Sequence, residues 1–149
     1  DVYVGGVAAY YGVKVGYICT RCFNNGTISI KQMGGRFFCG GLFGHLGGDG
    51  RELYNTGKVS GKKGSIFVGG LLGSYDNALA TEYGSYFIRN NYSTTSPLYG
   101  RSQISWEPFW ARGTKVSSIT SKSCTKLSRK YWTYSSKHKR LILKNNKEK

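Results

Sequence analysis

Acidic residues are scarce in this sequence: seven Asp and Glu stand against 22 Lys and Arg among its 149 residues, for a formal net charge of +15. The seven carboxylates are scattered and form no pair of the kind that general acid–base catalysis uses. The two histidines, His45 and His138, have no Cys, Ser or carboxylate at a spacing typical of an activated nucleophile. No glycine-rich stretch ends in the Gly-Lys-Ser/Thr of a phosphate loop. We therefore expect a protein that is not an enzyme and that holds no cofactor and no metal ion.

Long apolar runs are absent as well. No run approaches the roughly 18–20 residues that a membrane-spanning helix needs, so we expect no transmembrane segment. No window places apolar residues at helical spacing over three turns without an intervening glycine. The sequence has instead short runs rich in β-branched and aromatic residues, bounded by Gly and Asn, and such runs indicate strands. We therefore predict an all-β fold.

Two motifs recur in step along the first two thirds of the chain. The motif Gly40-Gly41-Leu42-Phe43-Gly44 returns as Gly69-Gly70-Leu71-Leu72-Gly73, and a weaker copy occupies residues 5–9. An Asn-x-Gly triplet recurs between the copies, at residues 24–26 and 55–57. Such triplets fit tight corners and could equally be hairpin turns. Because they return at the same phase as the distant glycine motif, a stacked repeat array, or solenoid, is favoured.

The residues that we assign to the structural repeat motif are Gly40, Gly41, Leu42, Gly44, Asn55, Gly57, Gly69, Gly70, Leu71 and Gly73. A degenerate trace of the Asn motif follows at residues 87–93, without a further glycine motif after it. The chain opens without Met or a signal peptide and already inside a repeat, so we expect it to be a segment of a longer protein. Bare strand edges at the ends of such an array favour self-association.

These motifs resemble the GLUG repeat. Two units carry the resemblance: Gly16 to Ser29 followed by Cys39 to Gly44, and Tyr54 to Gly61 followed by Val68 to Gly73. GLUG repeats occur in large surface and secreted proteins of bacteria, including adhesin-like proteins, and beside some peptidases directed at immunoglobulin A. The resemblance covers residues 2–96 and implies a parallel β-helix of about three repeats, secreted or at the cell surface. It also implies a role in adhesion or as a stalk that binds host glycoprotein or glycan.

The composition changes near Pro97. Residues 97–149 carry thirteen Lys and Arg against two Asp and Glu, whereas 20 of the 22 glycines precede them. We therefore divide the chain into repeats at residues 1–96 and a basic segment at residues 97–149, which forms a cap or a tail. Clustered Lys and Arg with interleaved aromatic residues also suit phosphates and stacked bases, so the alternative is a module that binds nucleic acid or another polyanion. A further alternative is a non-catalytic accessory region of a secreted peptidase.

Candidate ligand-binding residues are exposed aromatic and basic side chains on these two segments. They are Tyr75, Tyr83, Tyr86, Trp106, Trp132, Lys137, Lys139 and Arg140. A dominant role of the tryptophans and of the basic cluster would favour the polyanion alternative, and binding by residues 1–96 alone would favour adhesion.

The four cysteines are expected to be structural thiols. Cys19 and Cys22 form a Cys-x-x-Cys sequence, but residues three apart in a strand point to opposite faces, roughly 10 Å apart, and cannot share a metal ion. A disulfide between Cys39 and either Cys19 or Cys22 is left open by the sequence, and Cys124 stands alone.

Overall fold

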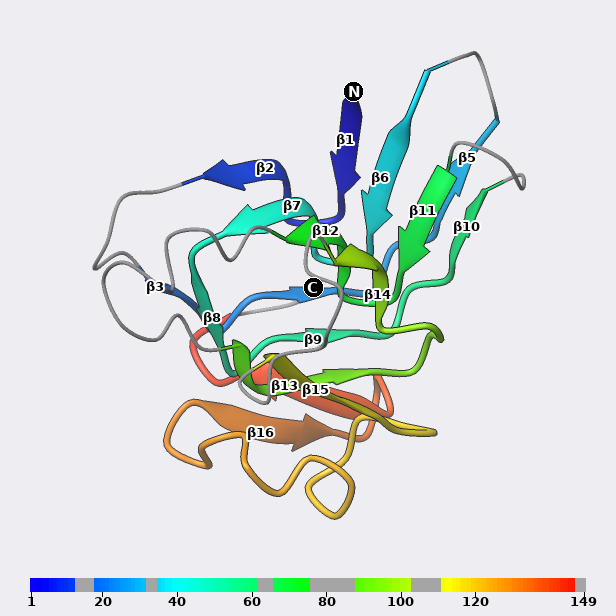
Figure 1. The fold of residues 1–149 in the computed structure, drawn as a ribbon. Coiled ribbons are helices and arrows are strands. Elements are labelled where there is room, and N and C mark those ends of the chain that lie inside the picture. The colour runs from blue at the N-terminus through cyan, green and yellow to red at the C-terminus, as the bar shows by residue number, and fades with distance from the viewer. Residues whose placement is uncertain (13–17, 32–34, 62–65, 76–87, 103–110, 147–149) are drawn as a thin grey trace.

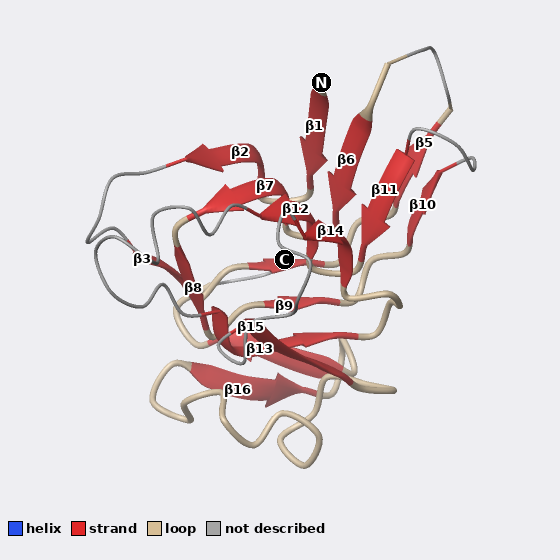
Figure 2. Cartoon of the chain, viewed as in Figure 1, coloured by secondary structure: helices blue, strands red, loops and turns tan. Residues whose placement is uncertain are grey.

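The structure, a computed structural model, describes residues 1–12, 18–31, 35–61, 66–75, 88–102 and 111–146. These ranges contain seventeen strands and no helix, which confirms the prediction of an all-β fold (Figure 2). No described segment is a helix of the length and apolar character that crossing a membrane requires.

The first fifteen strands follow one another in four successive passes, which we call levels (Figure 1). The first level consists of β1 (Val2–Gly5), β2 (Ala8–Gly12), β3 (Ile18–Thr20), β4 (Phe23–Asn24) and β5 (Ile28–Ile30). The second consists of β6 (Phe37–Gly40), β7 (Phe43–Gly47), β8 (Asp49–Arg51), β9 (Tyr54–Asn55) and β10 (Val59–Gly61). The third contains β11 (Ile66–Gly69), β12 (Leu72–Tyr75) and β13 (Ile88–Ser93), and the fourth contains β14 (Tyr99–Ser102) and β15 (Ala111–Lys115).

Every pairing among β1–β15 is parallel and joins a strand of one level to a strand of the next. The sheets are β1-β6-β11, β2-β7-β12-β14, β5-β10, and a six-stranded sheet of β3, β4, β8, β9, β13 and β15. Their register follows the sequence repeat, because Gly5, Gly40 and Gly69 are Cα partners. β16 (Trp132–Ser135) and β17 (Arg140–Leu143) form a separate antiparallel hairpin.

The two sequence motifs meet in space at each of the first three levels. A side chain at Gly41, the second glycine of its motif, would overlap the side chain of Asn55. A side chain at Gly6 would likewise overlap Asn24, and one at Gly70 would meet the Ser93 hydroxyl. A backbone carbonyl lies still closer to each added Cβ, that of Gly41 for Gly6, Gly70 for Gly41 and Thr95 for Gly70. The second glycine is therefore required because this carbonyl and the polar corner residue together occupy the space of a Cβ atom.

The corner residues also close their own turns and bond to one another. Asn55 donates from Nδ2 to the Gly57 carbonyl at 2.8 Å and accepts from the Gly57 amide at 3.1 Å. Asn24 makes the same two bonds to Gly26 and donates to Oδ1 of Asn55 at 2.9 Å. Asn55 is fully buried, so this ladder satisfies polar groups that have no access to water.

A second corner repeats without any sequence motif to mark it. Arg21, Glu52 and Asn90 all have left-handed backbone angles, with φ of 58°, 55° and 56°. The strand register places these three residues at the same position of successive levels, just before β4, before β9 and within β13. A conformation that side-chain-bearing residues adopt infrequently is thus dictated by the stacking and not by residue type.

Parallel pairing continues past Pro97, where the sequence shows no glycine motif. The Leu71 amide donates to the Leu98 carbonyl at 2.8 Å, and Leu72 is the register partner of Tyr99. Residues 96–100 therefore occupy the position of the earlier glycine motifs, and only the Leu-x-Gly of residues 98–100 repeats their sequence. The parallel region extends to Lys115, while the division into two domains at Pro97 stays a prediction.

Two apolar clusters lie on either side of β9. The first fills the space between the sheets and consists of Leu42, Phe43, Leu46, Leu53, Leu71 and Leu72. The second joins Tyr54 and Tyr92 to the C-terminal segment and contains Ile119, Cys124, Leu127, Trp132 and Leu141. Because Phe23, Tyr54 and Tyr92 come from three successive levels, residues 116–146 lie along the side of the stack and do not simply cap its last level.

We expect Gly57→Ala to lower the free energy of unfolding by about 3 kcal/mol, because the new Cβ would overlap the backbone carbonyl of Gly26 one level away. Gly26 is the matched control. It holds the same corner of the first level, where a Cβ would meet only Oδ1 of Asn24 at 3.3 Å. Gly26→Ala should change stability by less than about 1 kcal/mol. Urea denaturation of both variants measures these changes. Equal losses of stability would contradict the stacking of the Gly57 corner on the Gly26 corner.

Candidate anion-binding pocket

The hairpin β16–β17 is held against the stacked strands by aromatic packing. The Trp132 ring lies 5.2 Å from the Tyr54 ring and 6.3 Å from the Phe23 ring, centroid to centroid. The Tyr54 hydroxyl donates to the Leu141 carbonyl, and the Lys126 amide donates to the Tyr92 hydroxyl at 3.2 Å. These contacts place the ends of the hairpin beside the corner between β3 and β4.

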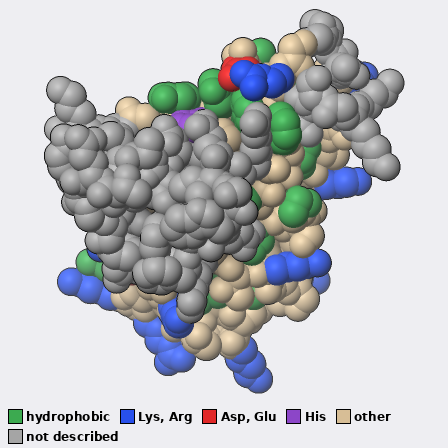
Figure 3. Space-filling view, viewed as in Figure 1, with side chains coloured by type: hydrophobic (Ala, Val, Ile, Leu, Met, Phe, Trp, Pro, Cys, Tyr) green, Lys and Arg blue, Asp and Glu red, His purple; other side chains and the backbone are tan. Residues whose placement is uncertain are grey.

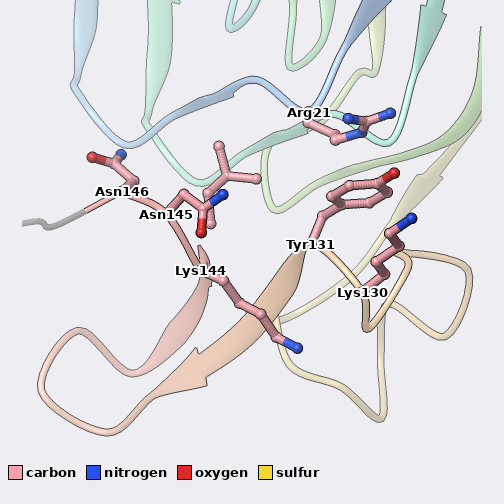
Figure 4. Close-up of a pocket in the computed structure, with 7 residues that line it drawn as sticks. Arg21, Lys130, Tyr131, Lys144, Asn145 and Asn146 are labelled. Carbon is pink, nitrogen blue, oxygen red and sulfur yellow. The ribbon is translucent and has the colours of Figure 1, made fainter.

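A cavity of about 460 Å³ lies where the hairpin meets this corner (Figure 4). Its seven lining residues are Arg21, Lys130, Tyr131, Leu143, Lys144, Asn145 and Asn146. Three of these described residues are cationic, two carry amide side chains and none is acidic. Only Arg21 comes from the repeats, so the pocket exists because the C-terminal segment packs against the first level.

Arg21 is fixed by both its backbone and its side chain. Its amide donates to the Arg51 carbonyl of the next level at 3.2 Å, and its φ of 58° turns the chain between β3 and β4. Its guanidinium carbon lies 3.7 Å from the centroid of the Tyr131 ring, as Figure 4 shows. This stacking is a cation–π contact, which orients the planar guanidinium while leaving its edge free to donate.

The Nε atom of Arg21 is buried and has no hydrogen-bond partner. An unpartnered buried donor on a charged group is costly, and a bound anion would remove that cost. Lys130 adds a second cation, with its amine 5.4 Å from the Tyr131 ring centroid, and Lys144 adds a third. In Figure 4, Asn145 and Asn146 lie across from Arg21 and Tyr131. Cations together with amides suit a ligand that carries an anionic group beside hydroxyl groups.

The C-terminal segment around the pocket is positively charged, and the Glu52 carboxylate of the second level contacts it by accepting from the Ser128 amide at 3.3 Å. Residues 116–146 contain eight Lys or Arg and no Asp or Glu. Lys and Arg side chains project around the lower part of the face in Figure 3, where β16 lies. The summed field of such a surface draws anionic partners towards it and weakens as salt is added.

The described residues that the sequence predicted to bind a ligand do not line this pocket. Trp132 is only 3% exposed and lies in the second core cluster, so its proposed role in stacking on a ligand is wrong for this structure. Arg140 is also buried, with its guanidinium carbon 5.2 Å from the Phe23 ring centroid. Lys137 and Lys139 are exposed but do not line the pocket. Tyr83, Tyr86 and Trp106 lie outside the described residues, and only the backbone of Tyr75 is described.

Sequence reasoning did not select the residues that line the pocket. Arg21 lies between Cys19 and Cys22 and is not among the predicted ligand-binding residues, and Lys130, Tyr131 and Lys144 belong to a basic segment without a motif. The basic segment itself was predicted to meet anions, and six of its residues line the pocket together with Arg21. A contact between residues more than a hundred positions apart has no local signal in the sequence.

Register also brings together a Ser and a His that the sequence keeps 29 residues apart. Nδ1 of His45 lies 3.0 Å from the Ser74 hydroxyl, because the two are Cα partners in β7 and β12. His45 is 4% exposed and Ser74 is 1% exposed, and the His45 ring is stacked on Tyr10. Because both side chains are buried, a substrate cannot reach the pair in this structure. The absence of catalytic activity stays a prediction.

Metal-binding clusters are not found in the part of the chain that the structure describes: no three His, Cys, Asp or Glu side chains gather there. All four cysteines are free. Among the described side chains of the repeats, the exposed large apolar ones all lie on the first level: Val2, Val7, Tyr10 and Ile18. They lie at the level whose outer edge has no described strand beside it, which is the place where self-association was predicted.

Trp132→Ala should destabilise the fold by about 3–5 kcal/mol, because it removes the ring that joins Phe23 and Tyr54 to the hairpin. Tyr134 is the control: it lies two residues further along β16 and is 48% exposed. Tyr134→Ala should cost about 1 kcal/mol or less. Guanidinium denaturation followed by tryptophan fluorescence and circular dichroism checks both, and a tolerated Trp132→Ala would show that this residue is not in the core.

No protein family, curated protein or solved structure matches this chain. The likeness to GLUG repeats therefore rests on the residues of the two motifs alone. What the protein does has to be argued from its own strand pairing and from the pocket beside Arg21.

Proposed function

We propose that this chain is a short parallel β-helix whose C-terminal hairpin completes a binding pocket for anionic glycans. The proposal has two parts, the architecture and the ligand. The observation that carries the second part is the Arg21 guanidinium, stacked on Tyr131 in a pocket that is lined by three cations and no acidic residue, with its Nε unpartnered.

Three features support the β-helix. Each pairing among β1–β15 joins neighbouring levels in parallel, and the order β1, β2, β3 returns as β6, β7, β8. Polar corner residues form a ladder along the stack, from Asn24 to Asn55. Aromatic rings also stack from level to level, with Tyr3, Phe38 and Phe67 separated by 5.2 and 5.0 Å. In such an array each unit buries its apolar face only against its neighbours.

Paired cysteines at register partners test the architecture. Ser29 of β5 and Ser60 of β10 are Cα partners, and neighbouring strands lie about 4.8 Å apart, within disulfide range. We expect Ser29→Cys with Ser60→Cys to cross-link under mild oxidation. Ser29→Cys with Gly61→Cys should not, because a shift of one residue points the side chains to opposite faces. Peptide mapping distinguishes these results, and cross-linking of the second pair alone would contradict the register.

An anionic glycan fits the pocket better than a nucleic acid. Non-specific binding of single-stranded nucleic acid relies on exposed aromatic platforms for the bases. Trp132 is buried, and the guanidinium of Arg21 already lies over the Tyr131 ring. A sugar carboxylate or sulfate would instead bind to Arg21, Lys130 and Lys144, while its hydroxyl groups bond to the Asn145 and Asn146 amides.

The resemblance to GLUG repeats supports a place for this module at the surface of a bacterial cell or in a secreted protein, as part of an adhesin or stalk. A rigid ladder of levels would then hold the pocket away from the cell. Several such modules on one protein would gain affinity by avidity, so that each pocket can bind weakly.

Arg21→Asn tests whether the Arg21 guanidinium binds the ligand. The substitution should keep the left-handed corner between β3 and β4, because Asn90 holds the equivalent position with φ of 56°. We expect this variant to lose tenfold or more in affinity for a heparin tetrasaccharide or for sialyllactose, since a charge-assisted hydrogen bond contributes about 1.5–3 kcal/mol. Isothermal titration at low and moderate salt, with single-stranded DNA of similar charge as a competitor, measures the loss.

A charge-matched pair of variants separates the pocket from the overall charge. Lys130→Ala with Lys144→Ala should weaken glycan binding about tenfold. Lys122→Ala with Lys137→Ala removes the same charge from exposed positions outside the pocket and should change affinity less than about threefold. Equal losses in both pairs, or tighter binding of DNA that survives Arg21→Asn, would overturn the glycan proposal in favour of a diffuse polyanion surface.

A further inference from the structure

Cys19 and Cys22 lie beside each other, with their sulfur atoms 3.7 Å apart. The expectation of roughly 10 Å assumed a continuous strand, in which residues three apart face opposite sides. The strand is interrupted there: β3 ends at Thr20, Arg21 takes a φ of 58°, and β4 begins at Phe23. This corner turns both side chains to the same side, where they pack against the first apolar cluster and remain partly exposed.

The two thiols are chemically unequal. A hydrogen bond from Cys19 lowers the pKa of Cys22 to about 7. The same hydrogen bond, together with burial, raises the pKa of Cys19 well above its ordinary value. Near neutral pH, Cys22 is therefore substantially thiolate, the nucleophilic form, while Cys19 keeps its proton.

The other two cysteines have neither feature. Cys39 is fully buried, and burial raises its pKa to about 11. Its Cα partners are Val4 and Val68, in a different sheet from Cys19, so the disulfides of Cys39 that the sequence left open have no support here. Cys124 is buried in the second apolar cluster, and burial raises its pKa as well. The chain thus contains two inert thiols as internal controls.

We propose that Cys19 and Cys22 form a reversible thiol–disulfide site that reacts with low-molecular-weight disulfides such as oxidised glutathione. The Cys22 thiolate attacks one sulfur of the external disulfide, forms a mixed disulfide and releases one thiolate. Cys19 then loses its proton, and its sulfur attacks the Cys22 sulfur and releases the second thiol. The protein dithiol is oxidised to a disulfide while one external disulfide is reduced to two thiols, and an excess of external thiol reverses the reaction.

The geometry favours the second step. A sulfur already in contact with the mixed disulfide reacts as an intramolecular group, so the mixed form should not accumulate. Bond formation requires the sulfurs to approach from 3.7 Å to about 2.05 Å, a movement within reach of side-chain rotation.

The sequence itself provides the assay. Trypsin cleaves after Arg21, so reduced Cys19 and Cys22 appear on separate peptides, residues 15–21 and 22–31. After the full chain is incubated with oxidised glutathione at pH 7.5, we expect these two peptides to be joined by a disulfide. Dithiothreitol should release them, and the peptides that contain Cys39 and Cys124 should remain unmodified.

Single substitutions separate the two roles. In Cys19→Ser we expect a stable mixed disulfide of glutathione at Cys22, because the resolving thiol is missing. In Cys22→Ser we expect Cys19 to stay at least tenfold less modified at pH 7.5. Circular dichroism checks that both variants fold; if either does not, the peptide map of the unsubstituted chain still decides.

The pH dependence of alkylation gives a second readout. For the unsubstituted chain, the rate of Cys22 modification by iodoacetamide should rise about tenfold between pH 6 and pH 8 and then level off, because the thiolate fraction saturates above a pKa of about 7. Cys19→Ala removes the hydrogen-bond donor to Cys22 and should move the midpoint above pH 8. A midpoint near 9 in both proteins, unlinked peptides after oxidation, or a mixed disulfide that persists in the unsubstituted chain would overturn the proposal. None of these readouts involves glycan binding, so this site can fail independently of the pocket.

Discussion

The contact between a glycine Cα and a polar corner residue is the constraint on which the rest of the structure depends. At Gly41 there is no room for a Cβ because the Gly70 carbonyl of the next level and Asn55 of the same level fill the space, and Asn55 in turn closes its corner on Gly57. This contact fixes the distance across each level, and the ladder from Asn24 to Asn55 fixes the rise to the next. Once both are set, parallel register follows for every strand, and the apolar cluster of leucines is enclosed between the sheets.

Stacking also creates chemistry that no single level possesses. The left-handed corner at Arg21 is repeated at Glu52 and Asn90, but only in the first level is it flanked by two cysteines. The same corner turns the Cys19 and Cys22 thiols together and directs the Arg21 guanidinium onto Tyr131. The left-handed corner at Arg21 therefore positions both groups. The two thiols lie on one side of this corner and the basic pocket lies on the other.

The C-terminal segment contributes to the site by its position. Its charge was evident in the sequence, and so was its aromatic content. Packing decides which of these groups meet solvent: Trp132 and Arg140 are buried against Tyr54 and Phe23, while Lys130 and Lys144 reach the pocket. Large aromatic side chains give the most free energy when buried, so the segment attaches to the stack through them and leaves the lysines outside.

The sequence by itself determined the all-β class, the positions of the glycine and asparagine motifs, and the excess of positive charge. Each of these is local or periodic, and periodic residues face the same environment at every level. Only the tertiary structure decided that Leu98 and Gly100 continue the repeat and that Arg21 meets Tyr131. These contacts join residues far apart in the chain, and they depend on register and on a backbone corner that residue type does not encode.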